Sequence, residues 1–181
     1  MIKSLTFVTG NAAKAEQLAR HLKFPVEHKK LELPEIQSLD TAEIIEHKVK
    51  EAYKKIRGPV LVEDTSLIFC ALGKLPGPLI KWFLHELGND GLCKMLDGYK
   101  DRRAIASVSF GLYDGKELFN FTNSVNGIIA KRPRGKAGFG WDPIFIVDGF
   151  KKTWAEMSDE EQKQSSLRRG ALKKLEKYLK K

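Results

Sequence analysis

Near its start the chain reads Leu5-Thr6-Phe7-Val8-Thr9-Gly10-Asn11, which is followed directly by Ala12-Ala13-Lys14. An apolar run of strand length meets Thr-Gly-Asn, and a helical pattern begins at once, which predicts a strand that turns tightly into a helix. Because the first turn of a helix directs free backbone N–H groups at whatever lies above it, this turn is a candidate anion site, with Lys14 beside it. Taken alone, an ordinary strand-turn-helix with a surface lysine is at least as good an interpretation.

Strand and helix patterns alternate along the whole chain. The expected strands lie near 3–8, 25–32, 60–62, 104–113 and 117–130. The expected helices lie near 11–22, 41–56, 80–87 and 90–96, with a last helix that opens at Ser158 and includes 165–169. We therefore predict an α/β fold, a single domain over 1–181. It has a twisted mixed central sheet, flanking helices and a second lobe, with a cleft between them.

Bulk properties limit the class of protein. The chain has 181 residues and a net charge of +9, which permits nucleic-acid binding or attraction of a polyanionic small substrate. Much of the excess charge falls on the polar face of the last helix, so nucleic acid is not the favoured partner. No apolar run has membrane-spanning length, and no targeting segment is evident at Met1-Ile2-Lys3-Ser4. Two cysteines without metal-ligand spacing fit a reducing cytoplasm, and we expect a cytoplasmic protein.

Acids and a hydroxyl follow the buried strand, in Val62-Glu63-Asp64-Thr65. We expect them where that strand ends, the usual place for ligands in an open α/β sheet. Hard oxygen ligands suit Mg²⁺, which prefers one or two carboxylates plus substrate phosphates. Glu35, behind Pro34, is a second candidate ligand, and Lys48 is a candidate phosphate cation. The alternatives are that the acids after the strand only cap a helix or turn, that Glu35 is an ordinary loop residue, and that Lys48 is an ordinary surface lysine.

The segment Ala137-Gly138-Phe139-Gly140-Trp141-Asp142-Pro143 spaces two aromatic residues with glycines. Glycine permits sharp turns and close approach to a ligand. Phe139 or Trp141 is suited to stack on a planar base, and Asp142 to accept hydrogen bonds from ring N–H groups. A tight turn with its aromatics in the core is the alternative.

Taken in order, these motifs resemble the inosine triphosphate pyrophosphatase (Ham1-like) family over nearly the whole chain. The matching motifs are Thr-Gly-Asn-x-x-Lys, Leu-Pro-Glu, Val-Glu-Asp-Thr, Leu-Pro-Gly-Pro, Phe-Gly-Trp-Asp-Pro and the final basic helix. The resemblance implies Mg²⁺-dependent hydrolysis of ITP, dITP and XTP to the monophosphate and pyrophosphate, which cleanses the nucleotide pool. It also implies a homodimer.

The resemblance also implies roles for individual residues. The implied triphosphate-binding turn is Thr9, Gly10, Asn11 and Lys14, and the implied metal ligands are Glu35 and Asp64. Further implied substrate contacts are Lys48, Thr65, Lys81, Ser166 and Arg168, and the implied base pocket is Phe139, Gly140, Trp141 and Asp142. Asp64, directly or by orienting a water, is the candidate for activating attack on the α-phosphorus, and Lys14 assists by offsetting phosphate charge.

Two positions depart from the family pattern. Leu167 stands where the family has the histidine of Ser-His-Arg, and leucine cannot donate a hydrogen bond to the purine. Gln162 stands where the family has a substrate-binding lysine, and the adjacent Lys163 points about 100° away on a helix. These changes predict weaker binding or relaxed base selectivity.

Two other classes of function stay open. One is a non-catalytic nucleotide- or RNA-binding module, for which a metal-holding acid pair is unnecessary. The other is a Maf-like pyrophosphatase acting on other modified nucleotides, which the Phe-Gly-Trp-Asp-Pro motif disfavours.

Overall fold

The computed structural model describes residues 2–180. The strands are β1 (Leu5–Val8), β2 (Val26–Lys29), β3 (Val60–Phe69), β4 (Pro76–Gly77), β5 (Arg103–Tyr113), β6 (Leu118–Ile129) and β7 (Phe145–Val147). The helices are α1 (Ala12–His21), α2 (Thr41–Ile56), α3 (Ile80–Lys94), α4 (Asp159–Gln164) and α5 (Leu167–Leu179), with short 3-10 turns at Cys70–Leu72 and Trp154–Glu156. Within the described residues, no helix has both the length and the apolar character needed to cross a membrane.

The strands form a seven-stranded mixed sheet in the order β2-β1-β3-β5-β6-β7, with β4 paired to β3. β1 is parallel to both β2 and β3, whereas β3 pairs with β4, and β6 with β7, in antiparallel fashion. The turn between β5 and β6 is organised by Asp114, whose Oδ1 accepts the backbone N–H groups of Lys116 and Glu117. The predicted mixed α/β sheet with flanking helices is confirmed.

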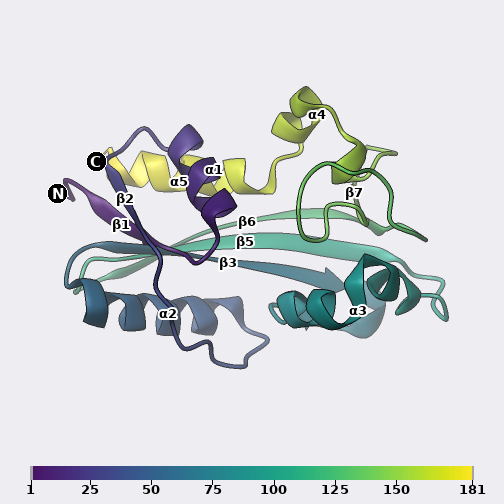
Figure 1. Cartoon of the computed structure of the whole chain (residues 1–181), viewed down its shortest axis with the longest axis horizontal. Coiled ribbons are helices and arrows are strands. Elements are labelled where there is room, and N and C mark those ends of the chain that lie inside the picture. Colours follow the sequence, from purple (N-terminus) through teal and green to yellow (C-terminus); the bar gives the residue numbers. More distant parts are fainter. Residues whose placement is uncertain (1, 181) are drawn as a thin grey trace. The chain divides into compact units, whose positions relative to one another are not determined.

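The chain divides into two compact units. The first contains the chain up to Asp64, Val108–Asn123 and the part from Arg168 onward. In this unit α1 and α5 lie on one face of the strands and α2 lies on the other (Figure 1). α2 packs Ile45, Val49 and Ala52 against buried residues of β1 and β3, because its apolar residues recur at helical spacing.

The second unit contains Thr65–Ser107 and Ser124–Leu167. Arg102 ties it together, since its guanidinium donates to the backbone carbonyls of Cys93, Ile129 and Ala130. α3 is kinked at Gly88, whose φ of 63° and ψ of −179° are not helical. The predicted pair of helices after residue 80 is therefore the two halves of α3.

Two predicted boundaries are wrong. β3 does not end at Val62 but continues to Phe69, because it pairs with β4 beyond the point where β1 ends. The last helix is two helices, α4 and α5, and Ser165 and Ser166 lie between them instead of inside one helix. Ser165 is the C-cap of α4, with φ −91° and ψ 5°, and its hydroxyl accepts from Trp154 Nε1 and donates to the carbonyl of Glu161.

Candidate active site

The turn Thr9-Gly10-Asn11 joins β1 to α1 as the sequence predicts. Asn11 is the N-cap of α1, and its Oδ1 accepts the backbone N–H of Lys14 at 3.3 Å. Thr9 Oγ1 accepts the backbone N–H of Asn11 at 3.1 Å, so the two side chains fix the turn from within. The turn therefore places Lys14 in the first turn of α1, beside the positive end of the helix dipole. An anion is favoured at such a position.

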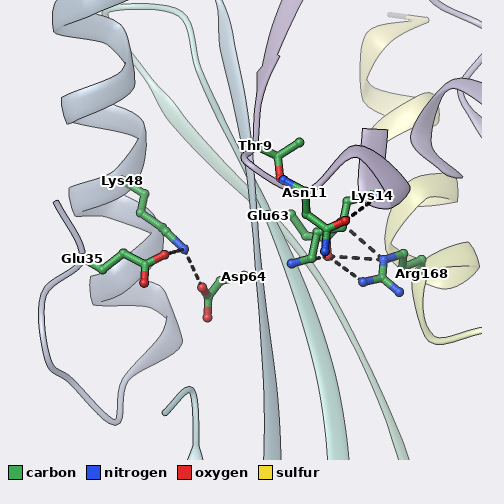
Figure 2. Close-up of polar contacts among 8 residues, drawn as sticks. All are labelled: Thr9, Asn11, Lys14, Glu35, Lys48, Glu63, Asp64 and Arg168. Atoms are coloured by element: carbon green, nitrogen blue, oxygen red, sulfur yellow. Dashed lines mark hydrogen bonds and ion pairs between the residues drawn. The ribbon is translucent and has the colours of Figure 1, made fainter. Parts of the chain in front are cut away.

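One cluster forms around Glu63 (Figure 2). Lys14 Nζ, from α1, lies 3.1 Å from Glu63 Oε1, and Arg168 Nη2, from α5, lies 2.9 Å from the same oxygen. Arg168 Nε is 3.3 Å from both carboxylate oxygens. The side chain of Glu63 is only 1% exposed, so this cluster is a buried ion-pair network.

A second cluster forms around Lys48, which projects from α2 (Figure 2). Lys48 Nζ lies 2.8 Å from Asp64 Oδ1 and 3.0 Å from Glu35 Oε1. The two acids that the family resemblance assigns to a metal are therefore brought together, with the Lys48 ammonium between them. Among the described residues, no group of three or more histidine, cysteine, aspartate or glutamate side chains forms a metal site.

The clusters lie on opposite faces of β3 because neighbouring side chains alternate along a strand. Glu63 points to the face that carries α1 and α5, and Asp64 points to the face that carries α2 (Figure 2). The acids lie within β3 and not at its end, which corrects the sequence prediction. They nevertheless fall just beyond the parallel pairing of β3 with β1, in which Thr6 faces Val60 and Phe7 faces Leu61.

The pKa values of the Glu63 and Asp64 carboxyls are shifted in opposite directions. Burial by itself raises the pKa of Glu63, but the charges of Lys14 and Arg168 outweigh it and hold that pKa below its ordinary value. Burial raises the pKa of Asp64 above its ordinary value, and Lys48 offsets only part of that effect. Burial would lower the pKa of Lys48, but Asp64 and Glu35 outweigh it and raise that pKa, so the lysine stays charged.

Asp64 also keeps one oxygen unused. Its Oδ2 is buried and has no hydrogen-bond partner within residues 2–180, whereas Oδ1 accepts from Lys48. An unpartnered buried carboxylate oxygen beside a second carboxylate fits a magnesium ion held by two acids and by substrate phosphates. Glu35 and Asp64 are thus chemically suited to the metal that the family resemblance implies.

The loop Phe139–Asp142 lies in the second unit. Asp142 Oδ2 accepts the backbone N–H of Phe139 at 2.8 Å, and Asn89 Nδ2 donates to the carbonyl of Gly140 at 3.0 Å. Gly138, with φ 79°, has no room for a Cβ, which would lie 2.3 Å from Asp142 Oδ2. The side chain of Asp142 therefore shapes the loop, a role that the sequence did not indicate.

The loop still offers groups to a planar ligand. The Trp141 indole N–H is buried and finds no acceptor in the part of the chain that the structure describes. Phe139 is among the exposed large apolar residues. Both observations are compatible with the predicted base pocket.

Four other positions named from the sequence belong to the second unit. Thr65 is half-buried inside β3, and Lys81 Nζ lies 5.1 Å from the centroid of the Trp82 ring on α3. Leu167 is 6% exposed and belongs to the apolar core. Gln162 Nε2 donates to the carbonyl of Trp154 at 2.9 Å, so it serves the packing of its own unit.

Sequence reasoning missed the roles of Glu63 and Asn89. Glu63 carried a signal, because an acid next to apolar Val62 in a buried strand must have a buried cationic partner. Asn89 carried none, since its contact with Gly140 spans 51 positions of the chain.

A model of the Ham1 family matches residues 5–178. The chain belongs to the Ham1 family. It is 45% identical over 172 residues to inosine triphosphate pyrophosphatase 2 of Trypanosoma cruzi (strain CL Brener), an alignment that covers 93% of this chain and 88% of that protein.

Solved Ham1 structures share the fold. The Staphylococcus aureus Ham1 protein aligns with a TM-score of 0.82 at 25% identity, over 98% of both chains. A Ham1 protein from Coxiella burnetii aligns with a TM-score of 0.86 at 24% identity, over 99% of both chains. The nucleoside-triphosphatase / dITP/XTP pyrophosphatase of Mycobacterium abscessus aligns with a TM-score of 0.78 at 27% identity, over 95% of this chain and 98% of that one.

Proposed function

We propose that this Ham1-family chain hydrolyses the triphosphates of deaminated purines, namely ITP, dITP and XTP, to the monophosphate and pyrophosphate. Its similarity to a protein named inosine triphosphate pyrophosphatase supports this substrate class. The observation that carries the reaction is the part-buried Asp64 carboxylate, whose buried Oδ2 has no hydrogen-bond partner among the described residues and whose Oδ1 accepts from the charged Lys48. Removal of such nucleotides keeps them out of the nucleotide pool.

The phosphate chain is bound by the first turn of α1 and by cations. The Thr9-Gly10-Asn11 turn brings the positive end of the α1 dipole to the phosphates, while Lys14 and Lys48 supply positive charge that offsets charge on the phosphates. Their fixed partners hold both ammonium groups in place before substrate arrives. Pre-organised charge of this kind lowers the barrier because little reorganisation is left for the reaction.

The Asp64 carboxylate is the proton acceptor in this proposal. A water oxygen attacks the α-phosphorus, the bond from that phosphorus to the bridging oxygen of the β-phosphate breaks, and pyrophosphate leaves. The proton of the attacking water passes to the Asp64 carboxylate, of which Lys48 occupies only Oδ1. A carboxylate whose pKa burial has raised is a better base than an exposed one.

Glu35 and Asp64 are the residues that would hold Mg²⁺. When bound, the ion would offset the negative charge of the phosphates. The Lys48 ammonium lies between the two carboxylates and contacts both of them. Chelation by EDTA is expected to abolish turnover and to leave the fold intact.

In the second unit, the loop Phe139–Asp142 is proposed to receive the purine. Phe139 and Trp141 supply stacking surfaces, and the Trp141 N–H is available to an acceptor on the ligand. Arg168 and Ser166 are further contacts, and Thr65 and Lys81 are additional substrate residues. Homodimer formation and a cytoplasmic location belong to the same proposal, and size-exclusion chromatography with light scattering measures the first.

Product analysis tests the proposed function. The protein is incubated with ITP and Mg²⁺, and the products are separated by ion-exchange chromatography. The proposal expects IMP and pyrophosphate in equal amounts, with lower rates for GTP and ATP. Inosine diphosphate plus phosphate would contradict it, a preference for pyrimidine triphosphates would support a Maf-like enzyme, and no turnover at high enzyme concentration would support a binding module.

A further inference from the structure

Glu63 connects two cations that come from different helices. Lys14 lies in the first turn of α1 and Arg168 in the first turn of α5, and neither helix has an acidic residue in its first turn. The N-terminus of a helix carries partial positive charge, so a cation there is disfavoured unless an anion lies nearby. Glu63 is the carboxylate that contacts both cations.

The geometry leaves the two cations very close to each other. Because Lys14 Nζ and Arg168 Nη2 lie 3.1 and 2.9 Å from one oxygen, they are at most about 6 Å apart. Both side chains are largely buried, with 18% and 17% of their surface exposed. Without a carboxylate between them, like-charge repulsion would drive them apart.

The carboxylate of Glu63 is also fully engaged, unlike that of Asp64. Oε1 accepts from Lys14 and twice from Arg168, and Oε2 accepts from Arg168 Nε. It therefore has little capacity left for a metal or a water. Its contacts point to holding other side chains and not to the reaction itself.

We propose that Glu63 is a positioning residue that holds Lys14 and Arg168 together and sets the charge that Lys14 presents to the phosphates. Arg168 contacts the same carboxylate, so the negative charge of Glu63 is shared between Arg168 and Lys14 and does not neutralise Lys14 fully. Without Arg168, Glu63 would pair with Lys14 alone, and Lys14 would bind phosphate more weakly. This inference rests on the proposed function, because it takes Lys14 as a phosphate contact.

A ligand without a base isolates this coupling. Binding of inorganic tripolyphosphate is measured by calorimetry in EDTA, so that neither metal nor chemistry contributes. Arg168→Gln is expected to weaken tripolyphosphate binding about tenfold, although that ligand has no base for the arginine to recognise. In a Glu63→Gln background the same change is expected to alter affinity less than about twofold.

Kinetics with ITP give a second readout. Glu63→Gln is expected to raise KM about 30-fold while kcat changes less than about threefold, because it misplaces binding groups and leaves Asp64 untouched. Glu63→Asp keeps the charge and should recover part of the lost affinity. Glu46→Gln is the matched control, since Glu46 pairs with Lys50 on the exposed face of α2, and it should leave KM unchanged.

Several outcomes would overturn the proposal. They are equal losses on Arg168→Gln in both backgrounds, no tripolyphosphate binding by the unchanged protein, and a Glu63→Gln protein with normal KM. If Glu63→Gln fails to fold by circular dichroism, Lys14→Gln takes its place in the cycle, and Arg168→Gln is again expected to alter tripolyphosphate affinity less than about twofold in that background; an equal loss in both backgrounds overturns the proposal there too. Failure of the proposed function is separate, since it appears as absent ITP hydrolysis with the tripolyphosphate cycle intact.

Discussion

Glu63 and Asp64 follow one another in β3, and their side chains leave the strand on opposite faces (Figure 2). Glu63 is 1% exposed, contacts two cations, and has a pKa below its ordinary value. Asp64 is 14% exposed, contacts one cation, and has a pKa above its ordinary value. Two acids of nearly identical chemistry are thus placed in opposite electrostatic states by a single step along the chain.

The difference separates stability from reactivity. A carboxylate whose ionised form is fully partnered stabilises the fold and acts on a substrate only through the side chains that it holds. A carboxylate with a buried free oxygen costs stability, and such strained groups gather at functional sites. This division assigns structure to Glu63 and chemistry to Asp64.

The largest expected effect on stability comes from Glu63. Glu63→Gln should lower the free energy of unfolding by about 3 kcal/mol, because it leaves two buried cations without their anion. Asp64→Asn should lower it by less than about 1 kcal/mol, since the loss of its Lys48 contact is offset by relief of a buried charge. Urea unfolding at pH 7 followed by circular dichroism measures both, and equal losses would remove the distinction between the acids.

The pH dependence of stability should follow Glu63. An acid with a lowered pKa stabilises the folded state above its unfolded pKa, and this contribution is lost as pH falls through the folded pKa. The unfolded value is near 4.5. The stability gap between the unchanged protein and Glu63→Gln should therefore be constant near neutrality and narrow below pH 4.5. A gap that persists undiminished at acid pH would show that the substitution acts through packing.

Leu167 tests the base side of the site. If the missing histidine relaxes selectivity, Leu167→His should raise the ratio of kcat/KM for ITP over GTP about fivefold. Because Leu167 is buried, the variant should also lose about 1–3 kcal/mol of stability. If the folded variant has the same ratio of kcat/KM for ITP over GTP as the unchanged protein, the hypothesis of relaxed selectivity is wrong.

Asn89 is expected to affect binding of the base indirectly, through the loop that contains Gly140. Asn89→Ala removes the hydrogen bond to the Gly140 carbonyl and should cost about 1 kcal/mol, seen as a KM for ITP raised about fivefold. The same variant should bind tripolyphosphate normally, because that ligand has no base. Weaker tripolyphosphate binding would mean that Asn89 acts on more than the loop.

The smallest expected change in stability comes from breaking an exposed ion pair, with which the buried Glu63 cluster can be compared. Glu46 and Lys50 form an i,i+4 pair in which both side chains are 53% exposed. Lys50→Ala should change the free energy of unfolding by less than about 0.5 kcal/mol, because solvent screens such pairs. A loss comparable to that of Glu63→Gln would show that burial is not what distinguishes the Glu63 cluster.

Local signals predicted much of the fold. Asp40 and the apolar spacing of Thr41–Ile56 gave α2 with its observed bounds, because a cap and an amphipathic stripe are properties of adjacent residues. The strand-turn-helix at Thr9-Gly10-Asn11 was predicted for the same reason. The last helix was mispredicted because its local pattern does not reveal the break at Ser165, whose hydroxyl contacts Trp154, a residue outside the helix.

The site was predicted as a set of residues but not as an arrangement. Family motifs supplied Glu35, Lys48 and Asp64, yet their convergence on one ammonium depends on how α2 packs on β3. The partnership of Glu63 with Arg168 joins positions 105 apart in the chain. No pattern in a single sequence specifies such a pairing.

Turnover of ITP by Asp64→Asn tests the division of labour most directly. Pyrophosphate release is measured with Mg²⁺ for the unchanged protein and for a folded Asp64→Asn variant. We predict that kcat at saturating Mg²⁺ and ITP falls about 10²–10⁴-fold, as expected for loss of a proton acceptor. A kcat within about tenfold of the unchanged protein would contradict the assignment of Asp64 to the reaction.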